Sequence, residues 1–263
     1  MNLTISKYHE NEEVDFFSNL SRLNFLFGKN GCGKSRILRE LQTLLQSQAN
    51  KYISRYIIPQ RGGVLRSDEK SDKNKTLKKD QSTNFKEQTV SRFKDLKLRV
   101  LERIEDPEDL RNTKITFQAY LNKVNSLLEN IEIKSSSNVF KIVSKDSPYG
   151  EIPPDQISSG EAELITLAIE ILCFAEENIK SEKTKILILD AADVYLDPES
   201  QAKLSNFTCN LALEENFYVI MASHSKYALA EINDTSNIHV AFMEKEDNQI
   251  QFNEVPDSVK TPE

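Results

Sequence analysis

Hydrophobic and polar positions along this chain of 263 residues alternate between short apolar runs and helical spacings, a pattern that predicts an α/β fold. Residues 2–27 contain short apolar runs separated by polar breaks, which predict two or three strands. Apolar positions at helical spacing follow, and this helix is expected to run to about Gln48. A further strand is predicted from Tyr52 to Ile58, where Pro59 and a later glycine pair end it.

The composition changes between Val64 and Lys134, and we interpret this stretch as an inserted lobe. Its first part, up to Asp80, is dominated by Lys and Asp. We expect a mobile loop there, because such a segment buries too little apolar surface to offset the cost of ordering it. A helix start is predicted at 106–109, and helical spacing occurs on both sides of it. The apolar positions with this spacing are Val90, Phe93, Leu96, Leu98 and Leu101, then Tyr120, Val124, Leu127 and Leu128.

The core is expected to resume after three consecutive serines, Ser135–Ser137, with a strand at Val139–Val143 and a loop at Pro148–Pro154. Two later apolar runs, Lys185–Leu189 and Tyr218–Ala222, are typical of buried strands. We therefore expect a mixed-sheet core interrupted by a helical lobe. The first half of the core is predicted at 1–63 and the second half at 135–250. The lobe lies between them at 64–134, and 251–263 form a tail.

The net charge of −7 argues against a protein that coats nucleic acid through its overall charge, although it does not exclude a local basic patch. Cys32, Cys173 and Cys209 have no C-x-x-C spacing, which argues against a disulfide framework or a zinc site and favours a reducing compartment. The N-terminus lacks the apolar core of a signal peptide, and no apolar run has the length of a membrane span. We expect a cytoplasmic protein with no membrane contact.

The strongest chemical motif lies in the stretch Phe25–Ser35, where an apolar run ends in G-x-x-x-x-G-K-S. Glycines at these positions let backbone N–H groups turn toward phosphate oxygens, while Lys34 adds a fixed cation and Ser35 offers a hydroxyl to Mg²⁺. A strand-like run precedes the motif and a helical pattern follows it, which favours a phosphate-binding loop (P-loop) over a glycine-rich structural turn. The predicted nucleotide-binding residues are Gly28, Lys29, Asn30, Gly31, Cys32, Gly33, Lys34 and Ser35.

Four further motifs follow in the second half of the chain. They are S-S-G-E at Ser158–Glu161, an apolar run ending in a carboxylate at Lys185–Asp190, Leu196–Pro198, and a strand-like run ending at His224. In order and approximate spacing, these motifs and the P-loop resemble the soluble ATP-binding cassette (ABC) ATPases of the SMC and RecF kind. The resemblance covers residues 20–62 and 150–230 and leaves the insert unmatched. It implies the fold of a P-loop NTPase of ABC type.

The resemblance implies that Ser158, Ser159, Gly160 and Glu161 form the signature motif, a second anion site at the start of a helix. The same residues also fit a simple helix cap in which Glu161 lies in the first turn. Both interpretations are open at this point.

The resemblance also assigns roles around the metal and the γ-phosphate. Asp190 corresponds to the Walker B residue that holds Mg²⁺ through water opposite Ser35. His224 corresponds to the switch histidine that contacts the γ-phosphate, although a histidine at the end of a strand can also be structural. Asp197 lies at the position of the D-loop, and Gln60 at that of the Q-loop, which also contacts the metal, with looser spacing.

One residue departs from the pattern of the family. The position after the Walker B aspartate is normally Glu, which activates the attacking water, and here it is Ala191. Since the other motifs are intact, we interpret Ala191 as an engineered substitution made to trap ATP. A natural switch that does not hydrolyse ATP and rescue by Asp193 are the alternatives. We expect the protein to bind ATP and to hydrolyse it poorly, because losing a general base costs about 10² to 10⁴ in rate.

In this family the P-loop of one protomer faces the signature motif of another, so the resemblance implies a homodimer, or a larger homo-oligomer, held together by ATP. The first hypothesis is a sensor or scaffold that controls an effector such as a nuclease or toxin, because the chain also resembles ATPase subunits of anti-phage systems such as PARIS. The second is a DNA-repair or recombination ATPase. About thirteen basic and about seven acidic residues between Arg61 and Arg103 could serve nucleic-acid binding, or could form a solvated loop. The third hypothesis is a transporter subunit.

Overall fold

A computed structural model describes most of the chain as two compact units. The described residues are 5–6, 13–14, 20–58, 81–105, 116–136, 139–146, 150–153, 156–230, 232, 237–246 and 249–254. The first unit, called the core unit below, consists of 1–59, 66–71 and 180–263. The second, called the lobe unit, consists of 60–65 and 72–179.

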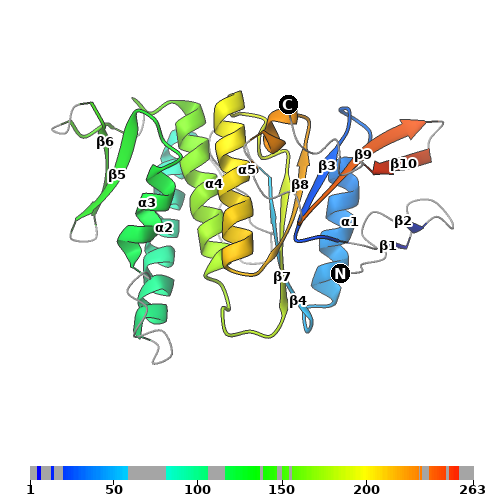
Figure 1. Cartoon of the computed structure of the whole chain (residues 1–263). Helices are drawn as coiled ribbons and strands as arrows, with labels where there is room; N and C mark the ends of the chain where they lie inside the picture. The colour runs from blue at the N-terminus through cyan, green and yellow to red at the C-terminus, as the bar shows by residue number, and fades with distance from the viewer. Residues whose placement is uncertain are drawn as a thin grey trace. The chain divides into compact units, whose positions relative to one another are not determined.

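A six-stranded sheet forms the centre of the core unit, with the strand order β10-β9-β3-β8-β7-β4 (Figure 1). Five strands run parallel, and β10 pairs with β9 in the antiparallel direction. Every residue of β3 is buried, as expected for a parallel strand covered on both faces. The strands are β3 (Leu23–Phe27), β4 (Tyr52–Ile57), β7 (Thr184–Asp190), β8 (Tyr218–Ser223), β9 (Ile238–Glu246) and β10 (Gln249–Glu254).

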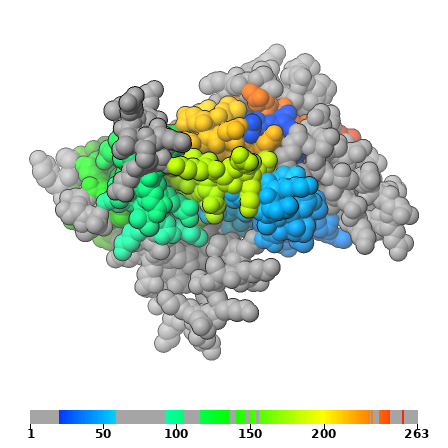
Figure 2. All heavy atoms as spheres, turned by 90° about the horizontal axis from the view of Figure 1, so that it is seen from below, coloured from blue at the N-terminus to red at the C-terminus, as the bar shows by residue number. Residues whose placement is uncertain are grey.

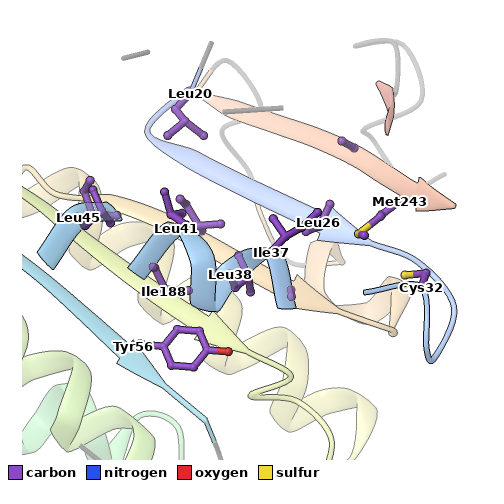
Figure 3. Close-up of a cluster of buried hydrophobic side chains, with 14 residues drawn as sticks. Leu20, Leu26, Cys32, Ile37, Leu38, Leu41, Leu45, Tyr56, Ile188 and Met243 are labelled. Carbon is purple, nitrogen blue, oxygen red and sulfur yellow. The ribbon is translucent and has the colours of Figure 1, made fainter. Parts of the chain in front are cut away.

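Helices cover both faces of this sheet (Figure 1). On one face, α1 (Lys34–Ser47) packs the stripe Ile37, Leu38, Leu41 and Leu45 against the sheet (Figure 3). On the other face lies α5 (Pro198–Glu214), whose Ser205 hydroxyl donates to Met221 Sδ at 3.5 Å. The predicted helix to about Gln48 is confirmed, since Gln48 is the C-terminal cap of α1.

The parallel arrangement brings the motifs of the core unit to one edge of the sheet. The C-terminal ends of parallel strands lie at the same edge, and here β3 leads into Gly28, β7 ends at Asp190 and β8 leads into His224. Figure 2 views the molecule from the opposite edge, where α1 ends and β4 begins. The strand order therefore explains how residues far apart in sequence can form one site.

The lobe unit is mainly helical. It contains α2 (Gln81–Glu105), α3 (Phe117–Asn125), β5 (Ile131–Ser136), β6 (Val139–Ser144) and α4 (Ser159–Ala175). Every residue of α4 from Glu163 to Ala175 is buried. The apolar spacing predicted for α2 is only partly a buried stripe, because Phe93, Leu96 and Val100 are buried whereas Leu98 and Leu101 are exposed.

Two ion pairs connect α2 to Glu170 in α4 and to Glu176, the residue that follows α4. Arg92 Nε lies 2.6 Å from Glu170 Oε1, and Arg103 Nη1 lies 2.9 Å from Glu176 Oε1. The Glu176 side chain is completely buried and also accepts a hydrogen bond from the hydroxyl of Tyr120. The ion pairs of Arg92 and Arg103 with these two buried glutamates thus attach α2 to α4 and to the residue that follows it.

The strand predicted at Val139–Val143 exists as β6, but it does not belong to the core sheet. It pairs in the antiparallel direction with β5, a strand that the sequence interpretation treated as a break around Ser135–Ser137. The reason lies in its aromatic residue. The ring of Phe140 stacks on that of Phe93 at a centroid distance of 4.6 Å and lies 5.9 Å from that of Phe117, so the strand packs within the lobe unit.

The ends of the chain also differ in detail from the expectation. The expected division between 250 and 251 falls inside β10. The strands expected before β3 are β1 (Ile5–Ser6) and β2 (Glu13–Val14), which pair in the antiparallel direction. The loop predicted at 64–80 and the helix start predicted at 106–109 lie outside the described residues. Within the described ranges, none of the helices combines the length and apolarity needed to cross a membrane.

Candidate functional site

The loop between β3 and α1 has a backbone that its glycines permit. A Cβ atom on Gly28 would lie 2.4 Å from the carbonyl oxygen of Met243, so no other residue fits this position without a shift of β9. Gly33 has a φ of 107° and caps the N-terminus of α1, in the left-handed region that other residues rarely adopt. The first turn of α1 contains no acidic residue. This leaves the positive end of the helix suited to an anion.

Lys34 lies beneath this loop and is buried. Its Nζ donates to the carbonyl oxygens of Gly28 at 2.7 Å and Lys29 at 3.1 Å. Burial lowers the pKa of the Lys34 ammonium group, and the nearby Cys32 and Asp190 oppose this shift. The side chain therefore brings a cation to the inner side of the loop, where the motif predicts contact with phosphate.

Asp190 ends β7 directly beside the start of α1. Its Oδ1 accepts a hydrogen bond from Ser35 Oγ at 3.0 Å, which confirms that these two residues, 155 positions apart, lie together. Its Oδ2 accepts from the hydroxyl of Tyr56, on β4, at 2.6 Å. Burial and the hydrogen bond to Asp190 raise the pKa of Tyr56, so the hydroxyl keeps its proton and acts as the donor.

Tyr56 is a site residue that the sequence interpretation missed. No local motif marks it, because it is one apolar-type position in a strand, and its contact with Asp190 depends on the pairing of β4 with β7. Knowledge of the strand order would have been needed to find it.

The residues available to hold a metal ion fit Mg²⁺ better than a softer ion. A serine hydroxyl and an aspartate carboxylate offer the hard oxygen atoms that Mg²⁺ prefers. In the described part of the chain, no group of three or more His, Cys, Asp or Glu side chains could hold a metal.

His224 follows β8 and points at the P-loop. Its Nδ1 lies 2.8 Å from the carbonyl oxygen of Gly28 and 3.3 Å from Lys34 Nζ. Because a carbonyl oxygen only accepts hydrogen bonds, the contact with Gly28 is a hydrogen bond in the tautomer that protonates Nδ1, whereas the other tautomer lets Nδ1 accept from Lys34. The structure thus brings His224, Lys34, Ser35 and Asp190 into one cluster at the edge of the sheet.

Ala191 adopts the left-handed backbone conformation, with a φ of 54°, directly after Asp190. Its N–H donates to the carbonyl oxygen of Ala222 at 3.0 Å, which fixes the position next to β8. A methyl group there provides no acid or base.

Asp193, the residue considered for rescue, is buried and accepts a hydrogen bond from the hydroxyl of Ser223. The same hydroxyl oxygen accepts from the N–H of Ser225 at 2.9 Å. The carboxylate therefore supports the backbone on either side of His224, an arrangement that favours a structural role for Asp193.

Asp197 caps the N-terminus of α5. It accepts hydrogen bonds from the N–H groups of Glu199 and Ser200 at 3.0 Å, and from the Ser200 hydroxyl at 2.6 Å. Hydrogen bonds from Ser200 lower the pKa of Asp197. In the single chain this residue is a helix cap, and its contact with nucleotide stays a prediction.

Ser158 caps α4 in the lobe unit. Its hydroxyl oxygen accepts from the N–H of Glu161 at 3.2 Å, which is the N-cap bond of a capping box. The hydroxyl donates to Glu161 Oε2 at 2.7 Å, so the glutamate contacts the serine side chain. Ser158 and Ser159 are exposed at the start of a 17-residue helix. The helix cap is therefore present, and the additional role of Ser158, Ser159, Gly160 and Glu161 as a second anion site stays a prediction. Gln60 lies outside the described residues.

Comparison with known proteins identifies the fold. No protein-family model and no curated protein matches the sequence. A crystal structure of an SMC head bound to the C-winged helix domain of ScpA is similar, with a TM-score of 0.50 and 11% identity over 93% of each chain. The SMC head domain from Thermotoga maritima has a TM-score of 0.50 and 12% identity over 89% of this chain and 90% of that chain. A metal-chelate type ABC transporter has a TM-score of 0.41 and 13% identity over 93% and 75%.

At such low identities the likeness concerns the fold. The chain has the mixed α/β fold of a P-loop ATPase of ABC type, as the sequence predicted. Its six-stranded sheet is mixed, because β10 is antiparallel to the other strands.

Proposed function

We propose that this chain, which has the fold of ABC-type ATPases, binds ATP with Mg²⁺ and forms a homodimer around the nucleotide. The observation that carries the proposal is the cluster of Lys34, Ser35, Asp190 and His224 at the end of the P-loop strand. These residues come from three separate motifs. An ammonium, a hydroxyl, a carboxylate and an imidazole at a helix N-terminus match the needs of a triphosphate and its metal ion.

Each residue has a distinct part in this proposal. The loop from Gly28 to Gly33 and the N-terminus of α1 receive the phosphates, and Lys34 neutralises their charge. Ser35 and Asp190 hold Mg²⁺, which, when bound, spreads the charge between phosphate oxygens. His224 leaves its contact with Gly28 to donate to the γ-phosphate. Hydrolysis is slow because Ala191 cannot activate water.

The dimer is the second part of the proposal. The exposed Ser158 and Ser159 at the start of α4 provide a helix N-terminus that can bind the γ-phosphate held by a second protomer. Neither half of such a site works alone, so assembly depends on ATP.

The dimer's role, in this proposal, is to act as a sensor or scaffold that controls an effector protein such as a nuclease or toxin, in anti-phage defence. The ion pairs Arg92–Glu170 and Arg103–Glu176 support it, because a partner that moves α2 also moves α4 and the signature motif at its start. The SMC head with the same fold is bound to a winged-helix domain of another protein, which supports a protein partner here as well.

A DNA-repair or recombination ATPase is the second candidate, favoured by the basic excess between Arg61 and Arg103. Two of those basic residues, Arg92 and Arg103, pair with buried glutamates and are therefore engaged within the lobe unit. DNA binding that is salt-sensitive and tightens with ATP would support this candidate over the first.

Light scattering with and without ATP and Mg²⁺ tests the dimer. We expect the mass to double with nucleotide and Ser158→Arg to prevent this while keeping ATP binding by the monomer. The matched control is Ser47→Arg, because Ser47 is exposed at the far end of α1, away from the P-loop. An unchanged mass at saturating ATP, or assembly of Ser158→Arg at the wild-type level, contradicts the proposal.

A further inference from the structure

Both carboxylate oxygens of Asp190 are held by hydroxyl groups from different elements. Oδ1 accepts from Ser35 Oγ at 3.0 Å, and Oδ2 accepts from Tyr56 Oη at 2.6 Å. The carboxylate is almost fully buried, with Asp190 3% exposed and Tyr56 8% exposed. The known motifs account for Ser35 but give no role to the hydroxyl of Tyr56.

The ring of Tyr56 is fixed by its surroundings. It belongs to the buried cluster beneath α1 that also contains Leu38 and Ile188. In Figure 3 its hydroxyl points toward the end of the cluster where Cys32 of the P-loop lies, and away from Leu45. β4 and β7 pair so that Tyr56 stands beside Ile188, two residues before Asp190. Tight packing leaves the ring little freedom, so its hydroxyl is a donor in a fixed position.

We propose that Tyr56 is a positioning residue for the magnesium ion of the nucleotide site, an inference that rests on the proposed function. Its hydroxyl holds Oδ2 of Asp190 and thereby keeps Oδ1 directed at Ser35 Oγ. Mg²⁺ requires near-ideal octahedral geometry, and groups that orient its ligands influence affinity strongly. Without the hydroxyl, the carboxylate can rotate, and Oδ2 becomes a buried acceptor without this donor.

The effect should be confined to the part of nucleotide binding that depends on Mg²⁺. Tyr56 does not contact the nucleotide in this proposal, because it acts only through Asp190. A tyrosine that merely fills the core would instead change nucleotide binding equally with and without the metal. This difference separates a positioning role from a structural one.

The test is Tyr56→Phe, which removes one oxygen atom and keeps the ring. Binding of a fluorescent ATP analogue is titrated in EDTA, and Mg²⁺ is then titrated at a fixed nucleotide concentration. We expect the Mg²⁺ concentration at half-saturation to rise about tenfold or more. The affinity in EDTA should change less than about twofold, because the ring and its packing are kept. Tyr52→Phe is the matched control, since Tyr52 lies on the same strand and packs against the same cluster.

The outcomes separate this inference from the proposed function. If the wild-type chain binds no nucleotide in either condition, the proposed function fails. If the wild-type chain binds nucleotide and Tyr56→Phe needs no more Mg²⁺ than Tyr52→Phe, the inference alone is overturned. Equal weakening with and without Mg²⁺ also overturns it. So does a wild-type affinity that is independent of Mg²⁺.

A second comparison keeps the inference testable if Tyr56→Phe folds poorly. Asp190→Asn removes the buried charge, so the double variant has no unpaired carboxylate oxygen. If Tyr56 acts through Asp190, adding Tyr56→Phe to Asp190→Asn should change the Mg²⁺ requirement less than about twofold. A tenfold effect of Tyr56→Phe in that background would show that the hydroxyl works by another route. Circular dichroism and thermal unfolding verify that each variant is folded.

Discussion

Introducing Ala191→Glu is expected to create ATP turnover. Ala191 lies directly after Asp190, and its N–H is fixed to Ala222 at 3.0 Å. A carboxylate at this position therefore starts from a defined backbone next to the proposed metal site. In the proposed nucleotide site, Lys34 lies beside His224, and Ser35 is bonded to Asp190, so the groups proposed to hold the phosphates and their metal ion are close together.

The magnitude follows from the chemistry and from the backbone. A positioned general base contributes about 10² to 10⁴ in rate, and the lower value corresponds to about 2.7 kcal/mol of transition-state stabilisation. The left-handed conformation of Ala191 costs an L-residue about 1–2 kcal/mol, but Glu bears the same Cβ and adds no branch there. The unfolding free energy should therefore change by less than about 0.5 kcal/mol.

Steady-state phosphate release decides the matter, with Ala191→Gln as the control of equal size and no carboxylate. We expect the Glu variant to hydrolyse ATP about 10²-fold faster than both the chain with Ala191 and the Gln variant. His224→Ala in the Glu background should lower the rate again without abolishing ATP binding. If the Glu variant is no faster than the Gln variant, position 191 is not a lost catalytic base, and a switch driven by ATP binding alone is the better account.

Two further predictions concern stability. Glu163 is buried, and burial raises its pKa to about 7 from its ordinary value of 4.5. Its protonated carboxyl group therefore favours folding fully below about pH 4.5, and this contribution is lost as the pH rises through about 7. Between pH 5 and 8 the unfolding free energy of Glu163→Gln should rise by on the order of 3 kcal/mol relative to that of the wild type, and urea-denaturation profiles of the two proteins that stay parallel over this pH range would contradict this. Arg103→Met removes the charged group that lies 2.9 Å from the buried Glu176 carboxylate and should cost about 3–5 kcal/mol, whereas Arg36→Met, which breaks the exposed pair with Glu40, should cost less than about 1 kcal/mol. Equal costs in urea denaturation would show that the buried pair has no special weight.

The sequence was sufficient to predict the features that depend on local patterns. The P-loop and the strand that ends at Asp190 were recognisable because glycine spacing and continuous apolar runs are properties of short segments. The structure confirms that Ser35 and Asp190 meet, and it confirms a mixed sheet, whose parallel strands bring the two residues together.

Features that depend on long-range pairing were not predictable in this way. β6 has the pattern of a core strand, but Phe140 packs on Phe93, so it joins the lobe unit instead. Leu98 fits the helical spacing of a buried face, but it is exposed. The buried face of α2 is the one that carries Phe93 and Leu96. Tyr56 gained its role only from the position of its strand beside β7.

The most direct test of the account is calorimetric titration of the chain with ATP and Mg²⁺, beside Lys34→Ala and the control Lys51→Ala. Lys34 donates to the loop from a buried position, whereas Lys51 is exposed at the turn before β4, at the other edge of the sheet. We expect the wild-type chain and Lys51→Ala to bind alike. Lys34→Ala should bind about 100-fold more weakly or not at all, the loss expected for a strong hydrogen bond to a charged group. Absence of ATP binding by the wild-type chain, or equal binding by Lys34→Ala, would contradict the proposal that this cluster is a nucleotide site.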